Sequence, residues 1–194
     1  MKNRNLYVGR YHSKGTLYPS STSFHLVRWH SPHPGIVKFN FDGSLCNSSV
    51  DGGFFLCDWA GRMLTVGAAF YITAFILVVE ARALRDGLNV AIEASFHKLI
   101  IEWDNKIVVQ ALDRTIQIPW KIQCIINAVL SWRNLRILFT TKHIFQEVNM
   151  TADWFSKFGH FIVRWFTIDF CFSPNLRVIL GDDVVGCSIK RRCV

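Results

Sequence analysis

The chain has 194 residues, which is enough for one domain with a sizeable core and additional segments at its ends. Hydrophobic residues make up 51% and charged residues 19%, a composition that excludes an intrinsically disordered protein. The net charge of +8 lies mainly toward the ends: residues 1–28 contain five basic and no acidic residues, whereas residues 29–160 contain twelve basic and eleven acidic ones. The basic excess is compatible with a polyanionic partner but does not establish one.

Cysteine usage and the N-terminal composition indicate a cellular compartment. The six cysteines form no C-x-x-C pair, and residues 1–28 lack the apolar run of a secretory signal. We therefore expect reduced thiols in an intracellular protein, in the nucleus or the cytoplasm. The seven histidines show no ligand spacing that would favour zinc. The predicted organisation is a basic, flexible leader over residues 1–28, one domain over 29–160 and a partly packed C-terminal tail over 161–194.

Three strands are predicted at the start of the domain. The stretch IVKFNFD (36–42) alternates apolar and polar residues, which is typical of a strand with one buried face. GGFFLCD (52–58) and MLTVGAAFYI (63–72) follow, separated by the turn WAGR (59–62). The short connection predicts an antiparallel meander of three strands.

The uncharged run of residues 63–79, which leads into Glu80, allows two interpretations. Its seventeen residues stand at the short edge of the length that spans a membrane, and Gly67 with two threonines makes the run less apolar. The alternative is a buried strand over residues 63–72, followed by a helix that begins within a few residues of Glu80. The elements that follow favour the second interpretation, and we expect no membrane partner.

Helical and extended patterns then alternate to the end of the domain. Together with the meander, this order favours an α/β fold around one mixed sheet. The predicted elements are a helix over 79–95, a strand over 98–104, a helix over 105–112, a helix that opens at Pro119, a strand over 135–144, and a helix over 150–160 with Asn149 as its cap.

Four acidic residues stand where the elements of such a sheet would converge. A buried carboxylate is costly unless it is paired, hydrogen-bonded or bound to a metal, so a cluster without cations favours divalent metal and should contain at least one raised pKa. Two Mg²⁺ ions about 4 Å apart could then support phosphodiester cleavage. Each acid also has a structural interpretation, as a turn residue, a partner of the helix dipole, a helix cap or a solvated helix position. The turn residue would be Asp42, the partner of the helix dipole Glu80, the helix cap Asp104, and the solvated helix position Asp153.

Five blocks of the sequence resemble, in order, those of the plant reverse-transcriptase-like ribonuclease H domains: VKFNFDGS, GGFFLCDWAGR, VEARALRDGL, IEWDNKIVVQAL and HIFQEVNMTADWFSKFG. The preceding WHSPHPGIVK resembles their Trp-Pro-Gly approach to the first strand, so the match covers about residues 29–160. The resemblance implies an RNase H-like fold, with a five-stranded mixed sheet whose first three strands are antiparallel and which is flanked by helices. It also implies a monomeric, metal-dependent endonuclease that hydrolyses the RNA strand of RNA/DNA hybrids. The alternative is a catalytically weak or inactive nucleic-acid-binding module derived from a retroelement.

The resemblance also assigns roles to individual residues. His143 matches a histidine that assists water entry or product release, although a strand-end histidine is an equally simple interpretation. Asn47 matches a position that contacts the minor groove of the hybrid, and Asn105, beside the third acid, is a second candidate for nucleic-acid contact. The residues that match the family's ligands for two Mg²⁺ or Mn²⁺ ions are Asp42, Glu80, Asp104 and Asp153.

The chain departs from the family pattern at three places. Gln146 stands where an arginine is usual, and Asn105 stands where a serine is usual. Apolar residues occupy positions 75–78, where polar side chains that reach the substrate often precede the second acid. These changes bear on substrate affinity more than on metal binding. We also expect the basic residues 1–28 to contribute to nucleic-acid affinity and not to cleavage itself.

Overall fold

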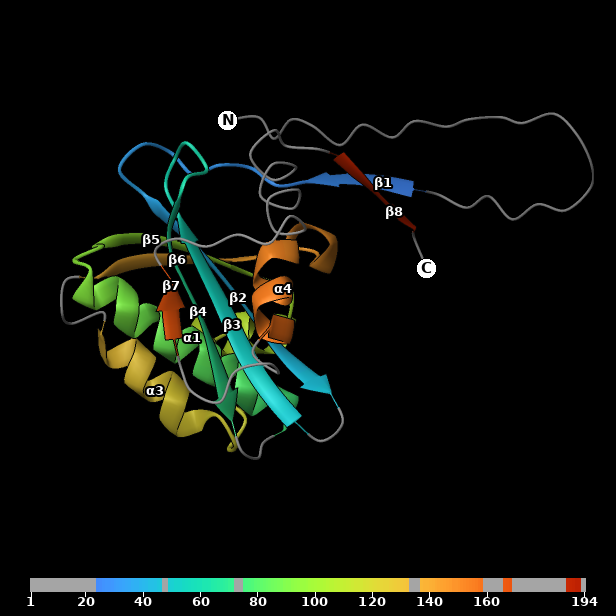
Figure 1. Cartoon of the computed structure of the whole chain (residues 1–194). Helices are drawn as coiled ribbons and strands as arrows, with labels where there is room; N and C mark the ends of the chain where they lie inside the picture. The colour runs from blue at the N-terminus through green and yellow to red at the C-terminus, as the bar shows by residue number, and fades with distance from the viewer. Residues whose placement is uncertain are drawn as a thin grey trace, which may run out of the picture.

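The computed structural model describes residues 24–46, 49–71, 75–132, 137–158, 166–168 and 188–192. Six strands form one sheet in the order β6-β5-β2-β3-β4-β7 (Figure 1). β2, β3 and β4 are antiparallel neighbours, whereas β5 runs parallel to β2, and β6 runs parallel to β5. The strands are β2 (Val37–Cys46), β3 (Ser49–Cys57), β4 (Met63–Tyr71), β5 (Lys98–Trp103), β6 (Leu138–His143) and β7 (Phe166–Ile168).

The predicted five-stranded mixed sheet is confirmed by the order β4-β3-β2-β5-β6. The sequence did not predict β7, a strand of three residues that pairs with β4 and extends the sheet at that edge. Its apolar pattern, Phe166–Ile168, is too short for periodicity to distinguish it from a loop.

The uncharged run forms a strand and the first turn of a helix. Residues Met63–Tyr71 form β4, and α1 (Ile76–Glu93) begins four residues before Glu80. The strand-then-helix interpretation is therefore confirmed. Within the part of the chain that the structure describes, no helix is long and apolar enough to cross a membrane.

Helices cover both faces of the sheet, and two neighbouring glycines of β3 identify which helix lies on which face. A Cβ atom added at Gly52 would lie 2.9 Å from the Cβ of Ala83 in α1, whereas one added at Gly53 would lie 2.2 Å from the backbone nitrogen of Ser156 in α4 (Met150–Phe158). Because successive residues of a strand point to opposite faces, α1 and α4 lie on opposite sides of the sheet (Figure 1). α2 (Lys106–Leu112) and α3 (Gln123–Ser131) complete the layer that contains α1.

The main core lies between the sheet and the layer of α1, α2 and α3. It is rich in aromatic side chains: Phe41 stacks on Phe39 with ring centroids 5.4 Å apart and lies 4.0 Å from the ring of Trp103. A smaller cluster under α4 contains Trp29 and Phe155. Burial of these rings, with the aliphatic side chains packed around them, is a large favourable contribution to the free energy of folding.

The segment that enters the first strand is held by a buried lysine. Lys38, which is 2% exposed, forms an ion pair with Glu102 at 2.9 Å and donates a hydrogen bond to the carbonyl oxygen of His30. Its ammonium group also lies 4.2 Å from the centre of the Trp29 ring. This lysine therefore links the Trp-Pro-Gly approach to β2 and β5.

The end of the predicted leader is a strand. β1 (Phe24–Arg28) pairs in antiparallel register with β8 (Ser188–Arg192), with Leu26 opposite Lys190 and Val27 opposite Ile189. The predicted flexible leader therefore differs from the structure over its last five residues, because backbone pairing with a distant segment cannot be read from local composition. Residues 1–23 lie outside the described residues.

We expect Gly53→Ala to destabilise the fold, because the added methyl group would clash with the backbone of α4 and not with a flexible side chain. Overpacking of this kind costs about 1–3 kcal/mol of unfolding free energy. Urea unfolding followed by circular dichroism measures the change. Thr140→Ala, at an exposed position of β6, is the control and should stay within about 0.5 kcal/mol of the wild type. Equal stability of the two variants would contradict the close contact of α4 with β3.

Candidate active site

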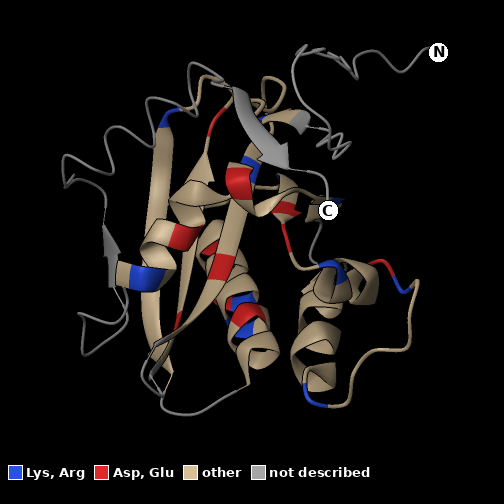
Figure 2. Ribbon diagram, turned by 90° about the vertical axis from the view of Figure 1, so that its right-hand side faces the viewer, with Lys and Arg blue, Asp and Glu red and all other residues tan. Residues whose placement is uncertain are grey.

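The four acidic residues lie on four different elements of the fold. Asp42 belongs to β2 and is 9% exposed, and Glu80 belongs to the second turn of α1 and is 7% exposed. Asp104 follows the end of β5, and Asp153 lies in the first turn of α4. Figure 2 shows acidic segments on the central strands and on the helices beside them.

Glu80 reaches Asp42 because α1 lies directly on β2. A Cβ atom added at Gly43, the residue after Asp42, would lie 2.8 Å from the Cγ of Glu80 and 3.2 Å from its backbone nitrogen. A larger residue at this position would require the Glu80 side chain, or the helix itself, to shift. The glycine therefore lets the second acid approach the first closely enough for their charges to interact.

Asn149 fixes α4 beside the same strand. Its Nδ2 donates to the carbonyl oxygen of Phe41 at 3.1 Å, and its Oδ1 accepts from Asn40 Nδ2 at 3.3 Å. The residue that the sequence identified as a helix cap thus ties the start of α4 to β2 through its side chain. One helical turn after Asp153, Ser156 donates from Oγ to Asp42 Oδ2 at 2.9 Å.

Burial and mutual repulsion raise the pKa of three of these acids. Burial is the largest cause for Asp42, whose pKa rises to about 7, and the charges of Asp104 and Asp153 raise it further. Burial, followed by the charge of Asp42, raises the pKa of Glu80 to about 8. The pKa of Asp104 is also raised, first by burial and then by Asp153. The prediction of at least one raised pKa is confirmed, although desolvation outweighs repulsion.

Hydrogen bonds within the protein oppose these shifts and occupy part of the carboxylate oxygens. Asn105 donates from Nδ2 to Glu80 Oε2 at 2.6 Å, and Ser156 donates to Asp42 as described above. Lys157 forms an ion pair with Asp153 at 2.6 Å, and among the described residues it is the one basic side chain that pairs with any of the four acids. The cluster therefore carries more negative charge than its protein partners neutralise.

The donor set fits a divalent cation in its chemistry. Carboxylate oxygens are the ligands that Mg²⁺ prefers, and a cation would relieve both the burial cost and the repulsion that raise these pKa values. As the side chains stand, no three His, Cys, Asp or Glu residues within the described ranges are grouped closely enough to hold a metal ion. Metal binding would therefore require the carboxylates to move closer together, and an ion would then compete with Ser156 and Asn105 for the oxygens of Asp42 and Glu80.

His143 lies at the end of β6, where its Nε2 is 2.9 Å from the backbone carbonyl oxygen of Asp104. Because a carbonyl oxygen only accepts, this contact requires the Nε2–H tautomer or the charged imidazole. The ring also packs edge-to-face on Phe145. The histidine is therefore held beside the third acid, and its role in water entry or product release stays a prediction.

Asn105 has a local role in the structure. Its Oδ1 accepts from the backbone nitrogen of Ile107 at 3.0 Å and caps α2, while its Nδ2 holds Glu80. Its predicted contact with nucleic acid stays a prediction. Asn47, the other residue predicted to contact nucleic acid, lies outside the described residues.

Sequence reasoning missed the side chains that hold the acids in place. Ser156 and Lys157 were not singled out, although their spacing of three and four residues from Asp153 places all three on neighbouring parts of one helix face. A small polar residue in the apolar side of a helix was the available signal for Ser156. Its partner, Asp42, is 114 residues away along the chain and could not be inferred from the local pattern.

Several solved structures with a similar arrangement of strands and helices are ribonucleases H. RNase H1 from the halophilic archaeon Halobacterium salinarum NRC-1 matches with a TM-score of 0.61 and 17% identity, over 64% of this chain and 97% of that one. The N-terminal RNase H domain of a Mycobacterium tuberculosis protein matches with a TM-score of 0.60 and 16% identity, over 64% and 92%. LC11-RNase H1, isolated from compost by a metagenomic approach and solved in complex with an RNA/DNA hybrid, matches with a TM-score of 0.57 and 16% identity, over 61% and 92%. The fold is therefore RNase H-like.

The sequence model of the reverse transcriptase-like family matches residues 40–159, which is more than half of the chain. The chain belongs to this family. The matched segment includes all four acids and His143. A search of curated protein sequences found no match.

The raised pKa values predict that the metal-free protein loses stability as pH rises. Asp42, with a pKa of about 7 when folded, titrates near 3.9 in the unfolded chain. Between these values the folded state binds more protons than the unfolded state, so the free energy of unfolding falls as pH increases. Asp42→Asn should stabilise the protein at pH 8 in EDTA by roughly 1–4 kcal/mol and flatten the pH dependence between pH 5 and 8.

Urea unfolding at pH 5 and pH 8 measures both effects. Glu93→Gln, which removes a carboxylate from an exposed position of α1, is the control and should keep the pH dependence of the wild type. If Asp42→Asn lost as much stability between pH 5 and pH 8 as the wild type, ionisation of Asp42 would not be the cause of that loss.

Proposed function

We propose that the domain is an RNase H-type nuclease that hydrolyses the RNA strand of RNA/DNA hybrids with the aid of two Mg²⁺ or Mn²⁺ ions. The observation that carries the proposal is the electrostatic coupling of four acids from four elements of an RNase H-like sheet, three of them with raised pKa values. Pairs of titratable groups shifted by burial and by each other are typical of functional sites. The solved complex of LC11-RNase H1 with an RNA/DNA hybrid supports the choice of substrate class.

Each of the four acids would have a role that follows from its position. Asp42 and Asp104 would hold the cations most directly, Asp153 would complete the second cation site, and Glu80 would orient the attacking water. When bound, the ions would supply charge stabilisation to the attacking and leaving oxygens of the phosphodiester. Asn105 would position Glu80 through its hydrogen bond, and His143, held beside Asp104, could carry a proton to or from the departing product.

A second function is favoured by a specific set of contacts. Ser156, Asn105 and Lys157 already bind oxygens of three of the four acids, and apolar residues replace the polar ones that usually precede Glu80. A catalytically weak or inactive module that binds nucleic acid would tolerate both features. Catalysis and binding therefore have to be measured separately.

Cleavage of a labelled RNA/DNA hybrid with Mg²⁺, with Mn²⁺ and with EDTA tests the proposal. Asp104→Asn removes a proposed ligand and should lower the cleavage rate by more than about 100-fold, a larger loss than is typical for residues that only form hydrogen bonds to metal ligands. Asp113→Asn removes the same charge from an exposed residue and should leave the rate unchanged. Circular dichroism of both variants confirms that each is folded.

The outcomes separate the two functions. Cleavage that persists in EDTA or in Asp104→Asn would contradict the nuclease proposal. Binding of hybrid without metal-dependent cleavage, in wild type and variant alike, would favour the binding module.

The basic leader should contribute affinity without contributing catalysis. Because Phe24–Arg28 pairs with β8, the deletion that leaves the described fold intact is residues 1–23, which contain four basic residues. Deletion should weaken hybrid binding and make the slope of log affinity against log salt shallower by about 1–3, while metal-dependent cleavage persists. A variant with glutamine at all four basic positions, Lys2, Arg4, Arg10 and Lys14, keeps the length and should behave like the deletion. An unchanged salt slope would show that the leader does not contact nucleic acid.

A further inference from the structure

Two large aromatic side chains with a lysine between them are exposed near the start of α1. Phe75, which directly precedes the helix, is 64% exposed, and Trp120, in the segment between α2 and α3, is 78% exposed. The ammonium group of Lys121 lies 2.9 Å from the centre of the Phe75 ring and 5.6 Å from that of Trp120. We call Phe75, Trp120 and Lys121 the aromatic–lysine cluster.

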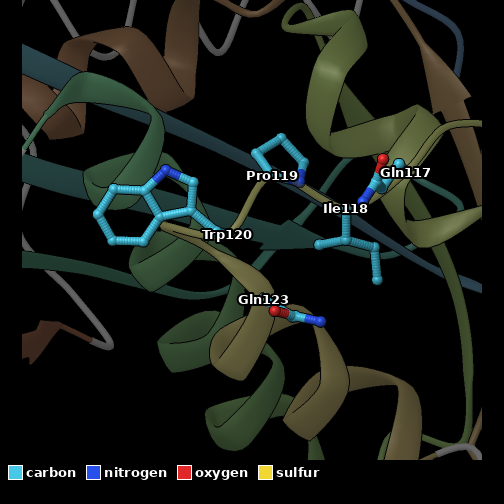
Figure 3. Close-up of a pocket in the computed structure, with 5 residues that line it drawn as sticks. All are labelled: Gln117, Ile118, Pro119, Trp120 and Gln123. Carbon is cyan, nitrogen blue, oxygen red and sulfur yellow. The ribbon is translucent and has the colours of Figure 1, made fainter.

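The fold holds Trp120 outward. Ile122 is fully buried in the main core, and its backbone nitrogen donates to the carbonyl oxygen of Pro119 at 3.0 Å, which closes a turn around Trp120 and Lys121. Figure 3 shows a surface pocket at this turn, with the Trp120 indole on the opposite side of Pro119 from Gln117. The indole is therefore presented to solvent by a turn that the core keeps in place.

The aromatic–lysine cluster extends to the start of the helix that carries Glu80. The carbonyl oxygen of Phe75 accepts from the backbone nitrogens of Val78 and Val79, so Phe75 begins the first turn of the helix that carries Glu80. Five residues of helix correspond to about 7.5 Å along the axis. Ile76, 38% exposed, lies one turn before Glu80 on the same side of the helix.

The chemistry of this surface suits unpaired nucleotides. Exposed aromatic rings stack on the faces of bases with little dependence on sequence, and a lysine beside them can contact the phosphate that joins two stacked bases. A base-paired duplex keeps its base faces stacked internally, so an aromatic platform gains contact area only from nucleotides outside the duplex. The cation between the rings also disfavours a wholly apolar partner, because burying it without an anion is costly.

We propose that the aromatic–lysine cluster binds the unpaired nucleotides of a single-stranded overhang that adjoins a hybrid, by stacking on Trp120 and Phe75 and by contact of Lys121 with phosphate. The proposal rests on the proposed function for the neighbouring duplex but concerns a separate surface. It assigns to the domain a preference for hybrids that carry a single-stranded extension over blunt hybrids of the same length.

Fluorescence anisotropy of the full chain in EDTA tests this assignment with three fluorescein-labelled probes: an oligothymidylate strand, a blunt RNA/DNA hybrid, and the same hybrid with an oligothymidylate overhang. Trp120→Ala should weaken binding of the single strand and of the overhang hybrid by roughly 5- to 100-fold, the range expected for loss of one stacked base. Binding of the blunt hybrid should change by less than about twofold. Trp59→Ala removes a tryptophan that is 51% exposed in the turn between β3 and β4 and should change none of the three.

A second pair of variants tests the phosphate contact. Lys121→Gln should reduce the salt dependence of single-strand binding by about one unit of slope. Lys98→Gln, at the exposed start of β5 and therefore at the opposite end of that strand from Asp104, should leave the slope unchanged.

Three results would overturn the proposal: no measurable binding of the single strand by the wild type, equal effects of Trp120→Ala and Trp59→Ala, or dissociation of a dimer by Trp120→Ala in size-exclusion chromatography, which would assign the surface to a second copy of the chain. These results are independent of the nuclease proposal. If Trp120→Ala lost the overhang preference while the wild type failed to cleave any hybrid, the binding surface would stand and the nuclease proposal would fail.

Discussion

Direct contact between helix and strand at glycine residues is the constraint on which the candidate site depends. Gly43 admits the Glu80 side chain against β2, and Gly53 admits the backbone of α4 against β3, with no space for even a methyl group at either position. An ordinary helix-on-sheet packing would keep a layer of side chains between the elements. Here the missing layer brings carboxylates from both faces of the sheet toward the middle of β2, where burial raises the pKa of Asp42 and Glu80.

Another buried carboxylate in the same sheet, Glu102, is stabilised by ion pairs. Glu102 is 3% exposed, two residues before Asp104, and it pairs with Lys38 at 2.9 Å and with Lys142 at 3.1 Å. That arrangement is the one expected of a structural buried carboxylate, since each charge has a partner. Asp42 and Glu80 are buried to a similar extent, but their partners are a serine and an amide, which carry no charge. Unlike Glu102, the carboxylates of Asp42 and Glu80 would therefore be stabilised by a cation from outside the protein or by a bound proton.

The sequence predicted strands and helices well where buried residues recur at the spacing of a strand or a helix. It predicted them less well where a contact with a distant part of the chain determines whether an element forms or where it begins. Alternation in residues 36–42 predicted β2, and the change of period after residue 79 predicted α1. By contrast, the helix expected to open at Pro119 begins at Gln123, because the backbone first turns so that Ile122 can enter the core. β1 and β7 could not be predicted, since each depends on pairing with a segment far away along the chain.

In the candidate site, too, the sequence predicted some residues and not others. The four acids could be found from their places in the predicted elements and from the order of the resembling blocks. Their partners could not: Asn149 matched the pattern of a helix cap, yet its amide is bonded to β2, and Asn105 serves Glu80 as well as its own helix. A cap is a local pattern, whereas the choice among several acceptors depends on which strand lies beside the side chain.

The apolar start of α1 changes what the site can recognise. Of the residues that replace the family's polar ones, Leu77 and Val78 pack against the core, whereas Phe75 and Ile76 remain exposed. Polar side chains at such positions can form hydrogen bonds with the 2′-hydroxyl groups that distinguish RNA from DNA. Exposed apolar side chains cannot form those bonds and contact instead the faces of bases and sugars, which RNA and DNA share. On the proposed function, discrimination between the two strands would then come from elsewhere in the domain, and the start of α1 would select for accessible, unstacked nucleotides.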